Sequence, residues 1–103
     1  MARSTWRDLH TERLASMTPV QRAEFDAAYE EASLAARVGE SVREAREATG
    51  LSQRELARRV GTTQAVISRI EMGSVGATLT TLQRIATSLG VELEVNFRLR
   101  QAG

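Results

Sequence analysis

Hydrophobic residues recur at helical spacing along most of the chain, and glycine directly follows four of the amphipathic segments. Leu34, Val38 and Val42 are spaced four residues apart, which places them on one face of a helix. A glycine after a helix matches the C′ position, where a left-handed backbone is favoured. The glycines at these helix ends are Gly50, Gly61, Gly73 and Gly90. The pattern therefore predicts an all-α domain with four marked helix ends.

Helix starts are marked by hydroxyl-bearing residues that can cap the first turn. Thr18 and Ser52 are each followed three residues later by Gln or Glu, which is the capping-box pattern. A proline occupies the first helical position after Thr18, where its fixed φ angle suits a helix start. The predicted cap residues are Thr18, Ser52, Thr63 and Thr78.

Gly39 leaves two alternatives for the segment between Pro19 and Ala48. The apolar spacing continues through this glycine, which favours one helix from Pro19 to about Ala48. A break at Gly39 is almost as well supported, because Ser41 and Glu44 have the spacing of a second cap and its partner. The sequence leaves both alternatives open.

Residues 91–100, with the sequence VELEVNFRLR, alternate strictly between apolar and polar side chains. This period of two predicts a half-buried β-strand. One strand is not stable alone, and no second alternating segment is found to pair with it. We therefore expect the strand to pair between two subunits around Asn96, which places both of its acids opposite arginines. The predicted dimerisation residues are Val91, Leu93, Val95, Asn96, Phe97 and Leu99.

These elements predict four consecutive parts of the chain. Residues 1–17 are expected to form a mobile N-terminal tail and residues 18–37 a helical extension. Residues 38–90 are expected to form the main helical domain, and residues 91–100 the dimerisation strand.

Length and composition limit the chemistry available to the protein. A chain of 103 residues suits one small binding domain better than the large core of a typical enzyme. There is no cysteine, and His10 is the only histidine, so thiolate metal sites, histidine metal sites and catalytic triads lack members. The sequence also has no glycine-rich phosphate loop. We expect a protein that is not an enzyme and uses no metal or cofactor.

Charge is nearly balanced, with a net charge of +1, and every basic residue is arginine. A modest positive excess lies within residues 38–90, which carry seven arginines and five acids. No apolar run approaches the roughly 20 residues of a membrane span, and the N-terminus has no signal-peptide pattern. A soluble, cytoplasmic protein is expected.

The segment from Gln53 to Ile70 carries the most specific pattern. Two short amphipathic helices are separated by Gly61, and Ala57 is small enough for their axes to approach closely. This predicts a helix-turn-helix unit, with an ordinary helical bundle as the alternative. The outer face of the second helix has amide and guanidinium groups suited to base edges in a DNA major groove. The expected base-reading residues are Gln64, Ala65, Ser68 and Arg69.

The stretches LSQRELARRVG, TTQAVISRIEMG and TLTTLQRIATSLGVELE resemble the XRE family of helix-turn-helix repressors. The resemblance implies a five-helix lambda-repressor-like domain that binds an inverted-repeat operator as a homodimer. It also implies a structural ion pair between Arg46 and Glu71. The residues expected to contact DNA phosphate are Ser52, Gln53, Thr62, Thr63, Gly76 and Thr78.

With its extension and its strand, the chain also resembles the HigA- and HipB-type antitoxins, which are XRE repressors that bind a toxin. This resemblance implies an autoregulating antitoxin, with a RelE/HigB-type ribonuclease or a HipA-like kinase as the toxin. It also gives an alternative for the strand of residues 91–100, which would then extend the sheet edge of the toxin instead of pairing between subunits. Trp6, Phe25 and Tyr29 would then be toxin contacts, although the apolar stripe of the extension also suits packing on its own domain or on a dimer mate. The alternative function is a stand-alone XRE-family regulator of phage or host genes without a toxin partner.

Overall fold

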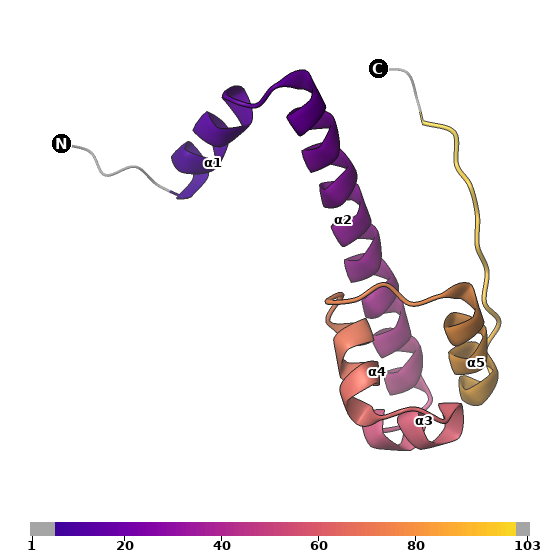
Figure 1. Ribbon diagram of the computed structural model, residues 1–103. Coiled ribbons are helices and arrows are strands. Elements are labelled where there is room, and N and C mark those ends of the chain that lie inside the picture. The colour runs from indigo at the N-terminus through magenta and orange to yellow at the C-terminus, as the bar shows by residue number, and fades with distance from the viewer. Residues whose placement is uncertain (1–5, 101–103) are drawn as a thin grey trace. The chain divides into compact units, whose positions relative to one another are not determined.

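The computed structural model describes the backbone of residues 6–100 and the side chains of residues 11–100 (Figure 1). Five helices occupy this range, and no residue in it belongs to a strand. The helices are α1 (Trp6–Ala15), α2 (Pro19–Ala48), α3 (Gln53–Val60), α4 (Gln64–Glu71) and α5 (Leu79–Leu89). The chain divides into two compact units, residues 1–33 and residues 34–103. The all-α prediction is confirmed for the described residues, but the five helices belong to the chain as a whole and not to the main domain alone.

Helix α2 continues without interruption through Gly39, which decides between the two alternatives left by the sequence. Gly39 is buried, and a Cβ atom added to it would overlap the carbonyl oxygen of Ile70 and lie 2.7 Å from that of Glu71. The glycine therefore lets α2 touch the backbone at the end of α4. The same contact continues at Gly73, where an added Cβ atom would lie 2.7 Å from the Cα atom of Ala36.

Hydrogen bonds confirm the predicted helix caps. The Ser52 hydroxyl accepts the backbone N–H of Glu55 at 3.1 Å, and Thr63 and Thr78 accept the equivalent N–H groups three residues later. Thr18 forms the expected reciprocal capping box with its partner at position 21. The glycines at the helix ends, Gly50, Gly61, Gly73 and Gly90, all have positive φ angles. Local sequence signals therefore set the helix ends.

The core of residues 34–103 lies where α3 packs against α4 and α5. Leu56 on α3 and Ile67 on α4 are fully buried, and Ala57 beside them is also buried. Burying a large aliphatic side chain contributes about 1.5–3 kcal/mol relative to leaving it exposed. The other buried hydrophobic residues are Val42, Ile70, Ile85, Ala86 and Leu89. This core holds α3 and α4 in a fixed relation.

Residues 91–100 form no strand, contrary to the expectation from their alternating pattern. They follow α5 as an irregular segment (Figure 1). A β-strand requires hydrogen bonds to a neighbouring strand, and the described part of the chain offers none. Phe97 and Leu99 are fully exposed here, with exposed fractions of 101% and 99%. The predicted strand is therefore not part of the fold of the single chain.

Residues 1–33 contain α1 and the beginning of α2. Helix α1 occupies residues 6–15, so most of the expected tail is helical. On α2 the rings of Phe25 and Tyr29 stack with their centroids 6.5 Å apart, and Tyr29 is 65% exposed. The side chain of Trp6 lies outside the described residues. Among the described helices, none has the length and apolar character needed to cross a membrane.

Candidate nucleic-acid interface

Helix α4 presents a polar face to solvent on the side opposite its buried isoleucines. Gln64 and Ala65 are exposed in its first turn, and Arg69 is exposed one turn later. The Arg69 Nε atom donates to the carbonyl oxygen of Ala65 at 3.4 Å, which holds the guanidinium along the helix. Ser68 is half-buried, and its hydroxyl lies 3.7 Å from the Sδ atom of Met72. Three of the four predicted base-reading residues are therefore exposed on one helix.

Residues predicted to contact phosphate lie at the starts of three helices. Ser52, Thr63 and Thr78 cap α3, α4 and α5, and each hydroxyl oxygen accepts a backbone N–H. The caps of α3 and α4 do not use the hydroxyl proton, so it can be donated to a phosphate oxygen. The Thr78 hydroxyl instead donates to a neighbouring threonine at 3.0 Å. Of the other predicted contacts, Thr62 is half-buried and Gly76 is exposed.

Arg46 on α2 and Glu71 at the end of α4 form the ion pair that the family resemblance implied. The Nε and Nη2 atoms of Arg46 donate to the two carboxylate oxygens at 2.7 and 2.9 Å, and Nη1 donates to the carbonyl oxygen of Leu51 at 2.9 Å. The side chain of Glu71 is only 2% exposed. Breaking such a buried pair costs about 3–5 kcal/mol, because the remaining charge is left uncompensated.

Two glutamines extend this ion pair to the start of α4. The Nε2 atom of Gln53 donates to Glu71 Oε1 at 3.0 Å, and the Nε2 atom of Gln64 donates to Gln53 Oε1 at 3.3 Å. Gln53 and Gln64 are the first residues of α3 and α4, so the second hydrogen bond joins the starts of the two helices. The sequence pattern predicts the two glutamines as separate DNA contacts and does not predict the hydrogen bond between them. The only signal for it was that both directly follow a cap residue.

The charge state of Glu71 follows from its surroundings. Burial raises the pKa of Glu71, but the hydrogen bonds from Arg46 and Gln53 and the guanidinium charge outweigh burial, and the pKa lies below its ordinary value. The hydrogen bonding between Arg46 and Glu71 also raises the pKa of Arg46 above its ordinary value. Glu71 is therefore ionised at neutral pH and can only accept hydrogen bonds.

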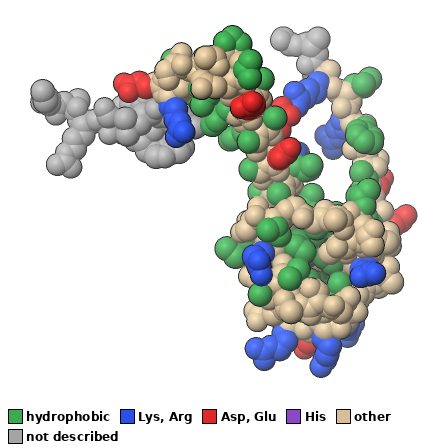
Figure 2. All heavy atoms as spheres, in the orientation of Figure 1, with side chains coloured by type: hydrophobic (Ala, Val, Ile, Leu, Met, Phe, Trp, Pro, Cys, Tyr) green, Lys and Arg blue, Asp and Glu red, His purple; other side chains and the backbone are tan. Residues whose placement is uncertain are grey.

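Positive charge is concentrated on α3. Arg54, Arg58 and Arg59 are exposed, and Figure 2 shows basic side chains gathered over the α3 end of the domain. The ion pairs found among the described side chains involve none of these three arginines. Exposed positive charge of this kind attracts a polyanion such as DNA.

Residues 42–96 match the family model described as Helix-turn-helix, which is more than half of the chain. The chain belongs to the helix-turn-helix family. Among solved structures, it is similar to the restriction-modification controller protein C.AhdI from Aeromonas hydrophila, with a TM-score of 0.58 and 31% sequence identity. This similarity covers 59% of the present chain and 88% of the controller protein. No curated protein matches the sequence.

The matched range of this helix-turn-helix protein contains all of the predicted base and phosphate contacts. The prediction of an XRE-type helix-turn-helix domain is therefore confirmed. The candidate toxin contacts Trp6, Phe25 and Tyr29 lie outside the matched range. The resemblance to HigA- and HipB-type antitoxins finds no support in these comparisons.

Proposed function

We propose that this helix-turn-helix protein is a transcriptional regulator that binds a specific DNA operator through α4. The observation that carries the proposal is the exposed polar face of α4, which begins at the capped helix start and is joined to the interior through Gln53 and Glu71. A rigid helix with such a face fits the major groove of B-DNA. The similarity to a controller protein supports a regulatory role.

The face of α4 has the chemistry needed for base readout. The amide of Gln64 can pair with adenine, and the guanidinium of Arg69 can pair with guanine. The methyl group of Ala65 suits a thymine methyl, and the hydroxyl of Ser68 suits a base edge. A good bidentate contact discriminates against the wrong base by about 1–3 kcal/mol.

Phosphate contacts would hold this face in register on the DNA. Helix starts bind phosphate because unpaired N–H groups and the helix dipole point at the anion. The residues proposed for these contacts are Ser52, Gln53, Thr62, Thr63, Gly76 and Thr78. The exposed arginines of α3 would add attraction that does not depend on sequence and weakens as salt is raised.

A stand-alone regulator is favoured over an antitoxin. One similar solved structure is a restriction-modification controller protein, and neither this similarity nor the family match connects the chain with a toxin. The stacked rings of Phe25 and Tyr29 need no toxin to explain them, because they lie one helical turn apart on α2. A toxin partner is therefore not part of the proposal.

Binding to an inverted-repeat operator would require a homodimer, because each half-site receives one α4. We assign dimerisation to residues 91–100. Val95, Phe97 and Leu99 are 58%, 101% and 99% exposed, and such a cluster of apolar side chains is unfavourable in water. If the segments of two copies paired as antiparallel strands, these side chains would form one apolar face that could pack on the helices of both copies.

Charge supports one register for this pairing. In a twofold pair centred on Asn96, Glu92 faces Arg100 and Glu94 faces Arg98, so each acid meets an arginine of the other copy. The apolar residues of the two segments then lie on one common face.

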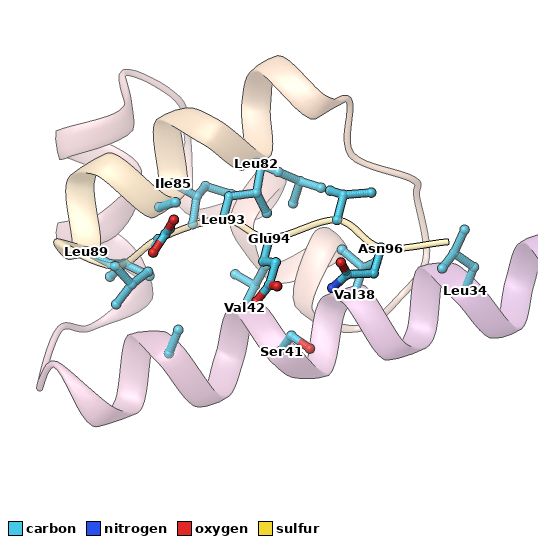
Figure 3. Close-up of a pocket in the computed structure, with 15 residues that line it drawn as sticks. Leu34, Val38, Ser41, Val42, Leu82, Ile85, Leu89, Leu93, Glu94 and Asn96 are labelled. Carbon is cyan, nitrogen blue, oxygen red and sulfur yellow. The ribbon is translucent and has the colours of Figure 1, made fainter. Parts of the chain in front are cut away.

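A largely apolar groove lies beside this segment, and Glu92, Glu94 and Asn96 also line it. The groove, of about 470 Å³, is formed by α2, α5 and residues 91–96 (Figure 3). Val38 and Val42 line it from α2, and Leu82 and Ile85 line it from α5, with Leu93 from the segment itself. A paired strand from a second copy would extend the apolar wall that Leu93 begins.

DNA binding is tested by selecting sequences from a random duplex pool with the wild-type protein. Affinities are then measured by fluorescence anisotropy at a fixed salt concentration. Gln64→Ala is expected to weaken binding to the selected duplex by about 1–3 kcal/mol. The control is Gln83→Ala, which removes an exposed glutamine that hydrogen-bonds within α5. Failure to enrich any sequence, or an unchanged affinity of Gln64→Ala, would contradict the proposal.

Dimerisation is tested by sedimentation. Truncation after Gly90 is expected to yield monomers at micromolar concentration. Glu94→Arg is expected to weaken the dimer, and adding Arg98→Glu is expected to restore it, because the pair is then reversed. A truncated chain that stayed fully dimeric would move the interface to the helices.

A further inference from the structure

The buried carboxylate of Glu71 is the first member of a hydrogen-bond chain that continues through Gln53 to Gln64. The direction of this chain means which residue donates and which accepts at each step. Both of its oxygens accept hydrogen bonds from Arg46, and Oε1 also accepts one from Gln53. An ionised carboxylate has no proton to donate, so every neighbour in contact with it has to be a donor.

The side-chain amide of Gln53 has a donor, the Nε2 atom, at one end and an acceptor, the Oε1 atom, at the other. The orientation of this amide therefore decides which of the two groups faces Gln64. The Nε2 atom has to face Glu71 Oε1, 3.0 Å away, since two oxygens at that distance would repel each other. The Oε1 atom of Gln53 is therefore turned toward Gln64. There it can only accept.

Gln64 is the last residue of this hydrogen-bond chain, and Gln53 sets the orientation of its side-chain amide. One N–H of its Nε2 atom is donated to Gln53 Oε1 at 3.3 Å. The second N–H and the Oε1 atom of this exposed side chain remain for a ligand. A donor beside an acceptor complements the N7 atom and the N6 amino group of adenine.

We infer that Glu71 is a positioning residue that fixes the direction of the Gln53–Gln64 chain and thereby selects adenine over guanine at one operator position. This inference rests on the proposed DNA-binding function and deepens it. Glu71 does not contact DNA, because its side chain is 2% exposed and occupied by Arg46 and Gln53.

The reversed chain would select the other purine. Gln64 Oε1 would then accept from Gln53, and both N–H groups of Gln64 would face outward. Two donors complement the N7 and O6 acceptors of guanine. A carboxylate at position 71 excludes this arrangement, whereas an amide there can donate or accept and permits both directions.

Two variants separate this role from a merely structural one. Gln53→Met removes the connection and leaves the Arg46–Glu71 ion pair in place, so it tests the inference even if the second variant does not fold. Glu71→Gln keeps the shape of the side chain and permits both directions. Gln83→Met is the matched control, because Gln83 is an exposed glutamine on α5.

The readout is the ratio of dissociation constants for guanine and adenine at a single position. The duplex selected by the wild-type protein is replaced one base pair at a time, and the position read by Gln64 is the one at which Gln64→Ala loses discrimination. The wild-type protein is expected to prefer adenine there by about tenfold or more. In Gln53→Met and Glu71→Gln this ratio is expected to fall to about one, with unchanged discrimination at other positions.

Two results would overturn the inference while leaving the proposed function intact. The first is a wild-type preference for guanine or a pyrimidine at the Gln64 position. The second is a Gln53→Met variant whose ratio of dissociation constants for guanine and adenine equals that of the wild-type protein, while its affinity falls equally for all duplexes. Gln53 would then act only as a phosphate contact. If the wild-type protein enriches no sequence at all, the proposed function itself is refuted, and the inference with it.

Discussion

Replacing Gly39 by alanine tests the close approach of α2 to α4. In an exposed helix interior this change stabilises a protein by about 1 kcal/mol. At Gly39 the new Cβ atom would overlap the carbonyl oxygen of Ile70 and lie 2.7 Å from the oxygen and 3.0 Å from the carbon of the Glu71 carbonyl. All three atoms belong to the backbone, so no side chain can rotate away to relieve the overlap.

The expected magnitude follows from these two opposing effects. Overpacking a well-packed site costs about 1–3 kcal/mol, and the upper end applies here because backbone has to move. Subtracting the helix-propensity gain of about 1 kcal/mol leaves a net destabilisation of about 2 kcal/mol. The same displacement would shift Glu71, so the DNA affinity of the folded fraction is expected to fall as well.

Urea denaturation followed by circular dichroism measures the free energy of unfolding for wild type and Gly39→Ala. The control is Glu44→Ala, an exposed position on the same helix, where the change should stay within about 0.5 kcal/mol. If Gly39→Ala stabilised the protein by about 1 kcal/mol, the glycine would be an ordinary helical position. This result would refute the close approach of the α2 backbone to the end of α4 at Gly39.

Acid is expected to destabilise the protein partly through Glu71, whose folded pKa is depressed. The stability that Glu71 contributes is complete above its unfolded pKa of about 4.3 and is lost as pH falls through the lower folded pKa. Over this pH range, urea titrations should therefore show a smaller loss in the free energy of unfolding for the double variant Arg46→Met/Glu71→Met than for the wild-type protein. Equal losses would contradict this. Thr63→Ala is expected to lower the free energy of unfolding by about 1 kcal/mol, because the cap of α4 is lost; an unchanged urea midpoint would contradict the cap. Arg69→Ala is expected to weaken operator binding by about 1–3 kcal/mol and to relax preference at one base pair. If anisotropy gave the same loss for Arg84→Ala, an exposed arginine on α5, Arg69 would act only through its charge.

Much of the helical domain could be predicted from the sequence, because its boundaries are set by local chemistry. A threonine or serine that accepts an N–H three residues later needs no distant partner, and Ser52, Thr63 and Thr78 cap the helices as predicted. The helix-turn-helix unit could also be predicted, since Ala57 and Gly61 satisfy packing and turn requirements within one short segment.

Features that depend on distant contacts could not be predicted in the same way. The sequence could not decide whether Gly39 breaks a helix or allows a close contact, because the answer lies in α4. The hydrogen bond between Gln53 and Gln64 depends on how two helix starts are placed and on the orientation of each amide. The alternation in residues 91–100 predicted a strand. A strand forms only beside a hydrogen-bonded partner strand, and the described residues of the single chain supply none.

The separation of buried from exposed residues on α4 bears on how its operator preference can be redesigned. Ile67 and Glu71 hold the helix in place, whereas Ala65 and Arg69 are exposed and contribute little to the core. Substitutions at such exposed positions usually change the free energy of unfolding by no more than about 0.5 kcal/mol. If α4 reads bases as proposed, we expect that new base preferences can be installed at Ala65 and Arg69 one residue at a time. A new preference at Gln64 is expected to require redesign of Gln53 and Glu71 behind it.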